Sequence, residues 1–326
     1  MPLSRFAATV LAPVEAVDLI PPPRFRAKNF TGFRLDPTVA GQAEAVAQVQ
    51  RFAVDRPGFF AGLFGGLCGA KVRPGLYLDG GFGVGKTHLL AAAFNAAPGS
   101  CRFLSFAEAM SLFTVRGKQA ALEVLFADLI CIDEFELDDP TNTRIADLLV
   151  TALMERGARI LTTSNTVPGE LGQGRMVVDL FRTQLARIEA SFTGVHVPGS
   201  DWRLKHAETG VALRYWGTSV EPLTGDGCVT VDAQRLDRWL QDIPVINLRR
   251  LAAVLTGLTV RDVTPFENQL AALRFVHLID RLYDHGVALR VSSTAQIADL
   301  FPPDSCQAAF VKKYRRCQSR LTELCS

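Results

Sequence analysis

The sequence predicts an α/β protein whose central layer is a parallel β-sheet covered by helices on both faces. From Gly75 onward, short apolar segments alternate with amphipathic helical segments, which is the order that parallel crossovers need. The apolar run at 129–132 has the composition of a strand buried on both faces. A glycine-rich turn at 80–85 separates the first apolar segment from a helical one. The predicted fold class is therefore α/β with a three-layer core.

The strands and helices of this core follow one another in order along the chain. Five short apolar runs are predicted as strands, at 76–78, 103–104, 129–132, 158–163 and 195–197. Helices are expected at 86–94, from 105 onward, at 139–156 and at 177–190. Ser105 and Glu108 have the spacing of a capping box, so we expect the second of these helices to begin there.

Three regions are expected along the chain. Residues 1–55 hold a proline-rich arm, in which IPPPRF at 20–25 opposes regular structure, and an amphipathic helix at 40–54. Residues 56–205 hold the core, and residues 206–326 form a C-terminal α/β and helical region. Its predicted helices are 232–240, 246–255, 267–283 and 310–324, and its predicted strands are 258–263 and 287–291. The predicted apolar side of the long helix consists of Leu270, Leu273, Val276, Leu278 and Leu282.

Composition excludes several classes of protein. The chain of 326 residues is 48% hydrophobic and 21% charged, which is typical of a folded globular protein rather than a disordered one. Its net charge of +2 lacks the basic excess of proteins that bind DNA through charge alone. No apolar run reaches the roughly 20 residues of a membrane span, and we expect no signal peptide. Seven cysteines without a Cys-x-x-Cys pair favour a reducing, cytoplasmic setting.

The strongest motif is GGFGVGKT at 80–87, which fits G-x-x-x-x-G-K-[ST] between a strand and a helix. Glycines let successive backbone N–H groups turn toward an anion, and the helix N-terminus adds a favourable dipole. We expect Lys86 to reach the β and γ phosphates of a nucleotide, and the Thr87 hydroxyl to ligate Mg²⁺. The expected nucleotide-binding residues are Gly80, Gly81, Phe82, Gly83, Val84, Gly85, Lys86, Thr87 and His88.

Two carboxylates follow the apolar run at 129–132. Asp133 is expected to hold Mg²⁺ together with Thr87, and Glu134 to act as the general base that polarises the attacking water. The next strand delivers Asn165 to the same edge of the sheet, where ligands of parallel sheets bind. The amide of Asn165 can donate to the γ phosphate and accept from the water.

Several basic side chains have open interpretations. Arg175, Arg182 and Arg187 lie on one segment, and any one of them can serve as an arginine finger for a neighbouring subunit or form part of a solvated helix face. The last helix carries a basic run that can form a solvated face or touch anionic lipid. This run consists of Lys312, Lys313, Arg315, Arg316 and Arg320.

These motifs resemble those of AAA+ ATPases, and more narrowly those of the ZapE/Afg-type family. The matching segments in the core are GLYLDGGFGVGKTHLL at 75–90, ICIDEFELDDP at 130–140, ILTTSNTVPGEL at 160–171, LGQGR at 171–175 and GSDWR at 199–203. Two further segments match near the C-terminus, ALRFVHLIDRLYDHGVALRVSS at 272–293 and YRRCQSRLTEL at 314–324. The resemblance spans nearly the whole chain, and DEF at 133–135, SDWR and SRLTEL are its discriminating parts.

The resemblance implies a P-loop NTPase core of the AAA+ type with a C-terminal α/β extension, which binds ATP and Mg²⁺. It implies catalytic roles for Lys86, Glu134 and Asn165, with Arg175 as the finger, and makes Arg274 and Arg320 candidates for a second sensor. It also implies assembly into a ring, with a hexamer as the expected form. Protein clients that include division-ring components, and contact with the inner face of the membrane, are further implications.

Two other functions are compatible with the same motifs. A helicase loader or replication initiator of the DnaC/DnaA type has a nearly identical phosphate loop, but the chain after Trp202 shows no basic recognition helix. A nucleotide-gated adaptor would bind ATP, recruit partners through the arm and the basic C-terminal run, and turn over negligibly. Glu134 favours hydrolysis over the adaptor.

Overall fold

The computed structural model describes residues 6–55, 75–137, 140–166, 178–199, 213–301 and 308–326. The chain folds into two compact units. The larger unit consists of Glu15–Pro21 and Phe25–Ala207, and the smaller unit of Met1–Val14, Pro22–Arg24 and Glu208–Ser326. The N-terminal arm is therefore divided between the two units, whereas the helix that follows it belongs to the larger one.

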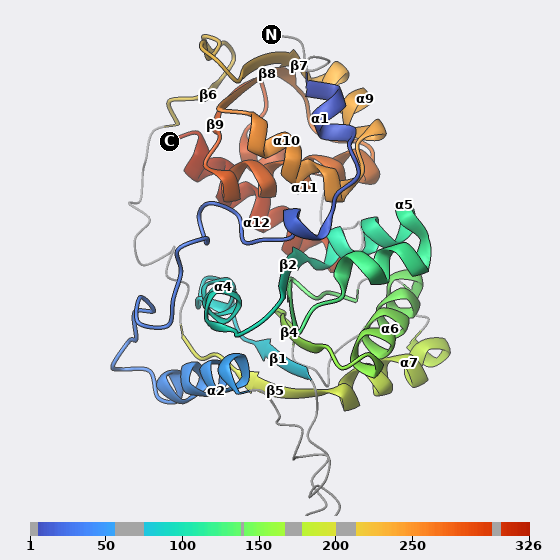
Figure 1. Ribbon diagram of the computed structural model, residues 1–326. Helices are drawn as coiled ribbons and strands as arrows, with labels where there is room; N and C mark the ends of the chain where they lie inside the picture. Colours follow the sequence, from blue (N-terminus) through green and yellow to red (C-terminus); the bar gives the residue numbers. More distant parts are fainter. Residues whose placement is uncertain (1–5, 56–74, 138–139, 167–177, 200–212, 302–307) are drawn as a thin grey trace, which may run out of the picture. The chain divides into compact units, whose positions relative to one another are not determined.

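The larger unit is built on a five-stranded sheet in which every pairing is parallel and the strand order is β2-β3-β4-β1-β5 (Figure 1). The strands are β1 (Gly75–Asp79), β2 (Cys101–Ser105), β3 (Leu129–Asp133), β4 (Arg159–Thr163) and β5 (Phe192–His196). Strand β4 lies between β1 and β3, so the carboxyl ends of these three strands meet at one edge of the sheet.

Helices cover both faces of this sheet, which confirms the predicted three-layer α/β fold. Helices α2 and α4 pack on one face, and α5, α6 and α7 on the other. Their bounds are α2 (Gln42–Val54), α4 (Lys86–Ala96), α5 (Phe106–Leu125), α6 (Pro140–Glu155) and α7 (Val178–Ser191). Successive side chains of β3 point to opposite faces of the sheet. Leu129 and Cys131 join the cluster under α2 and α4, whereas Ile130 and Ile132 face α5 and α6.

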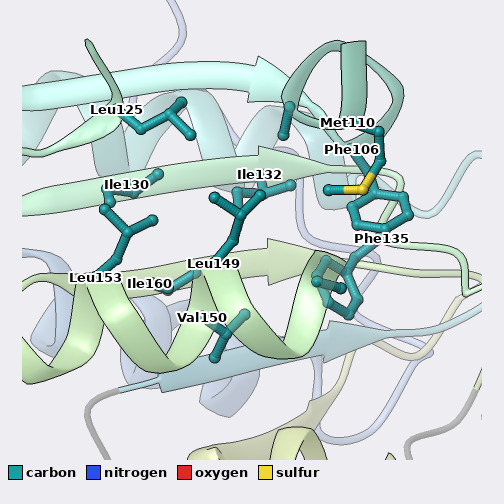
Figure 2. A pocket seen from close by; sticks show the side chains of 12 residues that line it. Phe106, Met110, Leu125, Ile130, Ile132, Phe135, Leu149, Val150, Leu153 and Ile160 are labelled. Atoms are coloured by element: carbon teal, nitrogen blue, oxygen red, sulfur yellow. The ribbon is translucent and has the colours of Figure 1, made fainter. Parts of the chain in front are cut away.

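The α5–α6 face is an apolar core with little free space. Figure 2 shows Phe106 and Met110 of α5, Ile130 and Ile132 of β3, and Leu149 and Leu153 of α6 lining one apolar region. The cavity that they leave measures about 10 Å³, which is close to the volume that one water needs. This face stabilises the sheet and has no room for a ligand of nucleotide size.

Local sequence signals fix where α5 begins and bends. The Ser105 side chain accepts from the Glu108 backbone N–H, and the Glu108 side chain accepts from the Ser105 N–H at 2.7 Å, so the predicted capping box is confirmed. Gly117 interrupts the helix with a φ of 74°. That left-handed conformation divides α5 into two straight segments.

The smaller unit contains its own parallel sheet, with the strand order β6-β9-β8-β7. Its strands are β6 (Trp216–Gly217), β7 (Cys228–Asp232), β8 (Gly257–Val263) and β9 (Ala288–Ser293). Its helices are α1 (Ala7–Leu11), α9 (Ala233–Asp242), α10 (Leu248–Val254), α11 (Gln269–His285) and α12 (Ala308–Leu324). Three short 3₁₀ turns complete the described elements of the chain: η2 (Ala16–Asp18) in the larger unit, and η4 (Val245–Asn247) and η5 (Ile297–Asp299) in the smaller unit.

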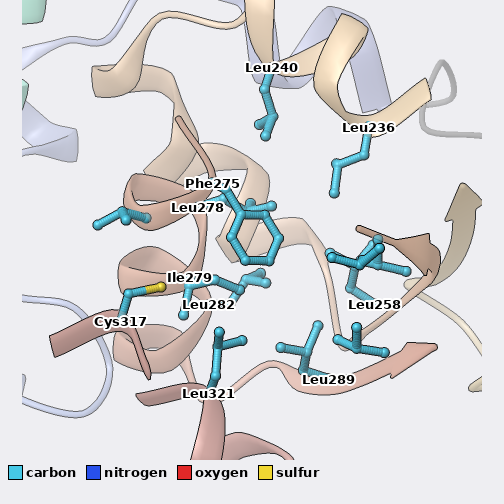
Figure 3. Packing of buried hydrophobic residues seen from close by; sticks show 14 of the residues in the cluster. Leu236, Leu240, Leu258, Phe275, Leu278, Ile279, Leu282, Leu289, Cys317 and Leu321 are labelled. Carbon is cyan, nitrogen blue, oxygen red and sulfur yellow. The ribbon is translucent and has the colours of Figure 1, made fainter. Parts of the chain in front are cut away.

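One hydrophobic cluster holds the smaller unit together. Figure 3 shows Phe275 and Leu282 of α11 packed with Leu258 of β8, Leu289 of β9 and Leu321 of α12. Val10 of α1 joins the same cluster. The first residues of the chain and its C-terminal third therefore share one core.

Three predictions for the smaller unit were wrong or incomplete. Strands β6 and β7 were not predicted, so the unit has more sheet than expected. Leu270 is 64% exposed and does not belong to the apolar side of α11, whereas the predicted Val276, Leu278 and Leu282 are fully buried and Phe275 and Ile279 join them. The helix expected at 246–255 begins with a 3₁₀ turn and becomes α-helical at Leu248.

The basic run on α12 is also not one solvated face. Arg316 and Arg320 are buried and pair with Asp280 of α11, Arg316 at 2.8 Å. The Tyr283 hydroxyl of α11 donates to Glu323 Oε2 of α12 at 2.6 Å. Two of the five basic side chains therefore join α12 to α11.

Polar side chains of the smaller unit hold the part of the arm that belongs to it. Asn247 Nδ2 donates to the carbonyl oxygens of Val10 and Ala12 at 2.7 and 2.9 Å. Arg24 donates to Glu323 at 3.0 Å, and its guanidinium lies 4.0 Å above the Tyr283 ring. Among the described residues, no helix has both the length and the hydropathy of a membrane span.

Candidate functional site

The glycine-rich loop at 80–85 leaves β1 and enters α4 as expected, and its backbone requires glycine at two positions. Gly80 has a φ of 148°, and a Cβ there would lie 2.5 Å from the Val197 carbonyl oxygen. Gly85 has a φ of 97°, and a Cβ there would lie 2.5 Å from the Phe33 ring. Gly85 is also the N-cap of α4 and provides no capping side chain, so the first N–H groups of α4 are available to an anion.

Lys86 lies in the first turn of α4 and is buried, with 8% of its surface exposed. Its ammonium donates to the carbonyl oxygens of Gly80 and Gly81 at 2.8 and 2.6 Å and to Asn165 Oδ1 at 2.9 Å. Burial lowers the pKa of Lys86 to about 8, although the carboxylates of Asp133 and Glu134 act in the opposite direction. A buried cation surrounded by neutral oxygens is a favourable place for a phosphate.

Asp133, at the carboxyl end of β3, lies between two hydroxyl groups. Thr87 Oγ1 donates to its carboxylate at 3.1 to 3.2 Å, and Thr163 Oγ1 donates to Oδ1 at 2.5 Å. A threonine hydroxyl beside a carboxylate is a set of hard oxygen donors that suits Mg²⁺, which binds proteins through few side chains and keeps its water and phosphate ligands. No larger cluster of metal-binding side chains exists among the described residues. The residues present fit Mg²⁺ bound with a nucleotide.

Glu134 follows Asp133 in a left-handed conformation, with a φ of 56°. Its N–H donates to Thr163 Oγ1 at 3.0 Å, and the next residue, Phe135, donates its N–H to the Thr163 carbonyl at 2.7 Å. The Phe135 ring is buried and contacts the rings of Tyr77 and Phe106. The turn that carries Glu134 is therefore fixed on both sides.

Asn165 follows β4 and reaches the same edge of the sheet. Besides accepting from Lys86, it donates through Nδ2 to Glu136 Oε1 at 3.3 Å. The structure thus brings Lys86, Thr87, Asp133 and Asn165 together, as the sequence predicted, with Glu134 next to them.

The other predicted loop residues have different surroundings. Phe82 is 37% exposed, whereas the Val84 side chain is buried in the core of the larger unit. His88 contacts the N-terminal segment: its Nε2 lies 2.9 Å from the Asn29 carbonyl oxygen, and its ring meets Phe33 edge to face at 5.4 Å. Burial lowers the pKa of His88. His88 therefore packs the start of α4 against residues 29–33.

The candidate arginines lie in several environments. Arg175 lies outside the described residues, and Arg182 is exposed on α7. Arg187 pairs with Asp147 at 2.6 Å. In the smaller unit, Arg274 pairs with Asp237 at 3.3 Å, and Arg320 is buried with Asp280.

Thr163 and Glu136 also lie at this edge, and neither was among the predicted site residues. Thr163 shares the segment TTSN with Asn165, so the run of small polar residues after an apolar strand was a usable signal. Glu136 follows DEF, but nothing in its spacing indicated that it would accept from Asn165. Asn29 and Phe33 come from a proline-rich region that gave no periodic signal.

A family profile described as AFG1-like ATPase matches residues 31–224 and 224–326. The chain belongs to the AFG1-like ATPase family. Two relatives of this AFG1-like chain carry the name cell division protein ZapE, one from Escherichia coli K12 and one from Escherichia coli O157:H7. Each is 26% identical over 298 residues, which cover 77% of either chain.

The AFG1-like chain also resembles several solved structures at low identity. It is similar to DnaI, with 19% identity, a TM-score of 0.45, and coverage of 57% of this chain and 98% of that one. The DnaC helicase loader gives 15% identity and a TM-score of 0.38 over 54% and 99% of the two chains. DnaA from Aquifex aeolicus, bound to AMPPCP, gives 19% identity and a TM-score of 0.35 over 53% and 50%. The AFG1-like chain has a mixed α/β fold with parallel sheets.

Proposed function

We propose that this AFG1-like protein binds ATP with Mg²⁺ at the edge of β1, β3 and β4, hydrolyses it, and couples hydrolysis to the remodelling of protein partners. The observation that carries the proposal is the juxtaposition of Lys86 with the Thr87–Asp133 pair. A buried ammonium held by three neutral oxygens lies beside a hydroxyl–carboxylate pair suited to a divalent cation. Phosphoryl transfer requires both elements.

Binding would begin with the loop at 80–87. Its backbone N–H groups and the first turn of α4 bind the phosphates, and Lys86 exchanges its carbonyl partners for β and γ oxygens. Asn165 would sense the γ phosphate with its amide, and its bond with Lys86 supports this role. Phe82, Gly83 and Val84 contribute through their backbone, and His88 supports the start of α4.

The acids at the end of β3 would have separate tasks. Thr87 and Asp133 would hold Mg²⁺, which neutralises charge on the β and γ phosphates when it is bound. Glu134 would accept the proton of the attacking water. Arg175 is proposed as the finger that a neighbouring subunit receives.

Partners are proposed on the basis of family and relatives. The relatives named as cell division proteins support a role at the division site, with protein clients there. We propose a ring of identical subunits, expected to be a hexamer, in the cytoplasm with peripheral contact to the membrane. DNA is not an expected partner because the net charge is only +2, so we predict no salt-dependent retention on a DNA column.

Phosphate release by purified protein tests the activity. Lys86→Ala removes the ammonium that holds the phosphates, and Glu134→Gln removes the base, so each should lower release by about 100-fold or more. Glu134→Gln should still retain ATP, because it leaves Lys86 and the loop intact. The mass of the protein, measured with and without ATP, should multiply when ATP is added.

The results distinguish hydrolysis from the alternatives. Equal and low release by all three proteins, with ATP still bound by the wild type, would leave the nucleotide-gated adaptor. Retention of the wild type on DNA that weakens with salt would favour the helicase-loader function.

A further inference from the structure

Thr163, the last residue of β4, is bonded to both acids at the end of β3. Its side-chain hydroxyl donates its proton to Asp133 Oδ1 at 2.5 Å and accepts the Glu134 N–H at 3.0 Å. The residue is only 2% exposed. A hydroxyl has a single proton to donate, so these two bonds fix its orientation with the O–H directed at Asp133 Oδ1.

The bond to Asp133 determines where the carboxylate lies. Two hydroxyl groups hold the Asp133 carboxylate, that of Thr163 in β4 and that of Thr87 in α4. Thr87 Oγ1 donates to Asp133 Oδ2 at 3.1 Å. Thr163 would remain with Asp133 when Thr87 and Asp133 take up a metal. Hydrogen-bond partners of metal-binding carboxylates orient them and affect affinity and activity.

The bond to Glu134 supports an unfavourable backbone conformation. Among the described residues, only Glu134 and Asp262 have a positive φ without being glycine. Such residues persist where their surroundings determine the conformation. The Thr163 hydroxyl and carbonyl receive the N–H groups of Glu134 and Phe135, so β4 fixes the turn from which the Glu134 side chain leaves.

From these contacts we propose that Thr163 is a positioning residue that places both Asp133 and Glu134 for metal binding and hydrolysis. The proposal rests on the proposed function. Thr163 touches neither nucleotide nor metal in this account. It acts through the two acids, so its loss should weaken the binding of Mg²⁺ and slow the chemical step while leaving the phosphate loop unchanged.

Thr162 offers a matched control. It is the neighbouring residue on β4, it is fully buried, and its Oγ1 donates to the Ile132 carbonyl at 2.9 Å. Because side chains alternate along a strand, Thr162 points to the opposite face of the sheet from Thr163. Thr162→Val therefore removes a buried hydroxyl from the same strand without touching either acid.

The experiment compares the full-length wild type with Thr163→Val, Thr163→Ser and Thr162→Val. Three quantities are measured: kcat and KM for ATP, the Mg²⁺ concentration for half-maximal rate, and the Kd for a fluorescent ATP analogue with Mg²⁺ and with EDTA. Thr163→Val should lower kcat and raise the Mg²⁺ requirement by about 10-fold or more. Its Kd in EDTA should equal that of the wild type, and Thr163→Ser should restore both altered values.

Thr162→Val should leave kcat and the Mg²⁺ requirement unchanged, although its melting temperature should fall about as far as that of Thr163→Val. If Thr163→Val does not fold, Thr163→Ala takes its place in the same comparison. Equal kcat and Mg²⁺ requirements for Thr163→Val and Thr162→Val would overturn the positioning role while the wild type still hydrolyses ATP. A wild type that binds the analogue under neither condition would instead overturn the proposed function, and the positioning role with it.

Discussion

The two units of the molecule bury charged side chains in opposite ways. In the larger unit, Lys86 donates to Gly80, Gly81 and Asn165, all of which present neutral oxygens. In the smaller unit, Asp280 is buried between Arg316 and Arg320, which both pair with it. Burial alone would raise the pKa of Asp280, but the two guanidinium groups hold it well below its usual range.

We interpret this difference as one between a charge kept for a proposed ligand, Lys86, and a structural charge, Asp280. The charge of Asp280 is compensated within the fold, where it joins α11 to α12. The ammonium of Lys86 has only neutral hydrogen-bond partners among those described above, and burial lowers its pKa. The carboxylates of Asp133 and Glu134 partly offset this effect of burial, and a phosphate would give the ammonium negatively charged hydrogen-bond partners.

The largest expected effect breaks the compensated cluster. Asp280→Asn would leave two buried guanidinium groups without their carboxylate, so the free energy of unfolding should fall by about 3–5 kcal/mol. Urea unfolding measures the loss. The matched control is Asp237→Asn, because Asp237 is 36% exposed and pairs with Arg274 at 3.3 Å. Such an exposed pair contributes about 0–1 kcal/mol, and equal losses in the two variants would contradict a structural role for Asp280.

A second prediction concerns the loop that surrounds Lys86. Gly85→Ala places a methyl group in a left-handed conformation and against the Phe33 ring, so phosphate release should fall about 10-fold to 100-fold. Gly117→Ala is the control, since Gly117 has a φ of 74° but nothing within 4 Å of an added Cβ. It should lower stability by about 1 kcal/mol and leave release unchanged. Equal release by both variants would show that the fit of the loop against Phe33 is unimportant.

The third prediction uses pH to change the charge of Lys86. Its pKa of about 8 in the folded chain lies below the ordinary value of 10.5, so the unfolded state binds more protons between these values. The stability of the nucleotide-free protein should therefore rise through this window relative to Lys86→Met. ATP affinity should run the other way and fall above pH 8 by up to about tenfold per pH unit, because the phosphates need the ammonium. Titrations with ATP between pH 8 and 10.5 measure this affinity. An affinity that is independent of pH would contradict the proposed binding of phosphate by the Lys86 ammonium.

The smallest expected effect compares the edges of the two sheets. Asp262 in β8 has a φ of 58° and donates its N–H to Ser292 Oγ of β9 at 2.9 Å, much as Glu134 donates to Thr163. In the described part of the smaller unit, no strand of the second sheet is followed by a glycine-rich loop and lysine like those at 80–86. Ser292→Ala should lower stability by about 1 kcal/mol without changing phosphate release. A loss of release as large as that of Thr163→Val would contradict this distinction.

The parts of the larger unit that the sequence predicted are those that depend on local patterns. The strand runs at 76–78 and 129–132 are apolar because both faces of the sheet are covered, and the loop at 80–87 needs its glycines to turn. Parallel strands bring their carboxyl ends to one edge of the sheet. Asp133 and Asn165 could therefore be placed at the same edge because each stands at or just after the carboxyl end of a predicted strand. Thr163 was hidden because its role depends on one hydroxyl reaching two residues of a neighbouring strand.

The smaller unit was harder to predict because two of its strands give weak signals and distant residues hold several of its elements. Strand β6 has only two residues, which is too few for a periodic pattern. Strand β7 has five, like each strand of the larger sheet, but its buried Val229 and Val231 alternate with less buried residues and form no apolar run. The burial of Arg320 follows from Asp280, which lies 40 positions earlier, and α1 is held by Asn247 far along the chain. Such contacts leave no mark on the local hydrophobic pattern.

The most direct test of the account is a calorimetric titration of a non-hydrolysable ATP analogue with Mg²⁺ into the wild type, Lys86→Met and Asp280→Asn, at a temperature where all three are folded. We expect the wild type and Asp280→Asn to bind with the same affinity, and Lys86→Met to bind about 100-fold more weakly or not at all. Equal binding by Lys86→Met and the wild type would contradict the central claim that Lys86 is the charge that holds the phosphates.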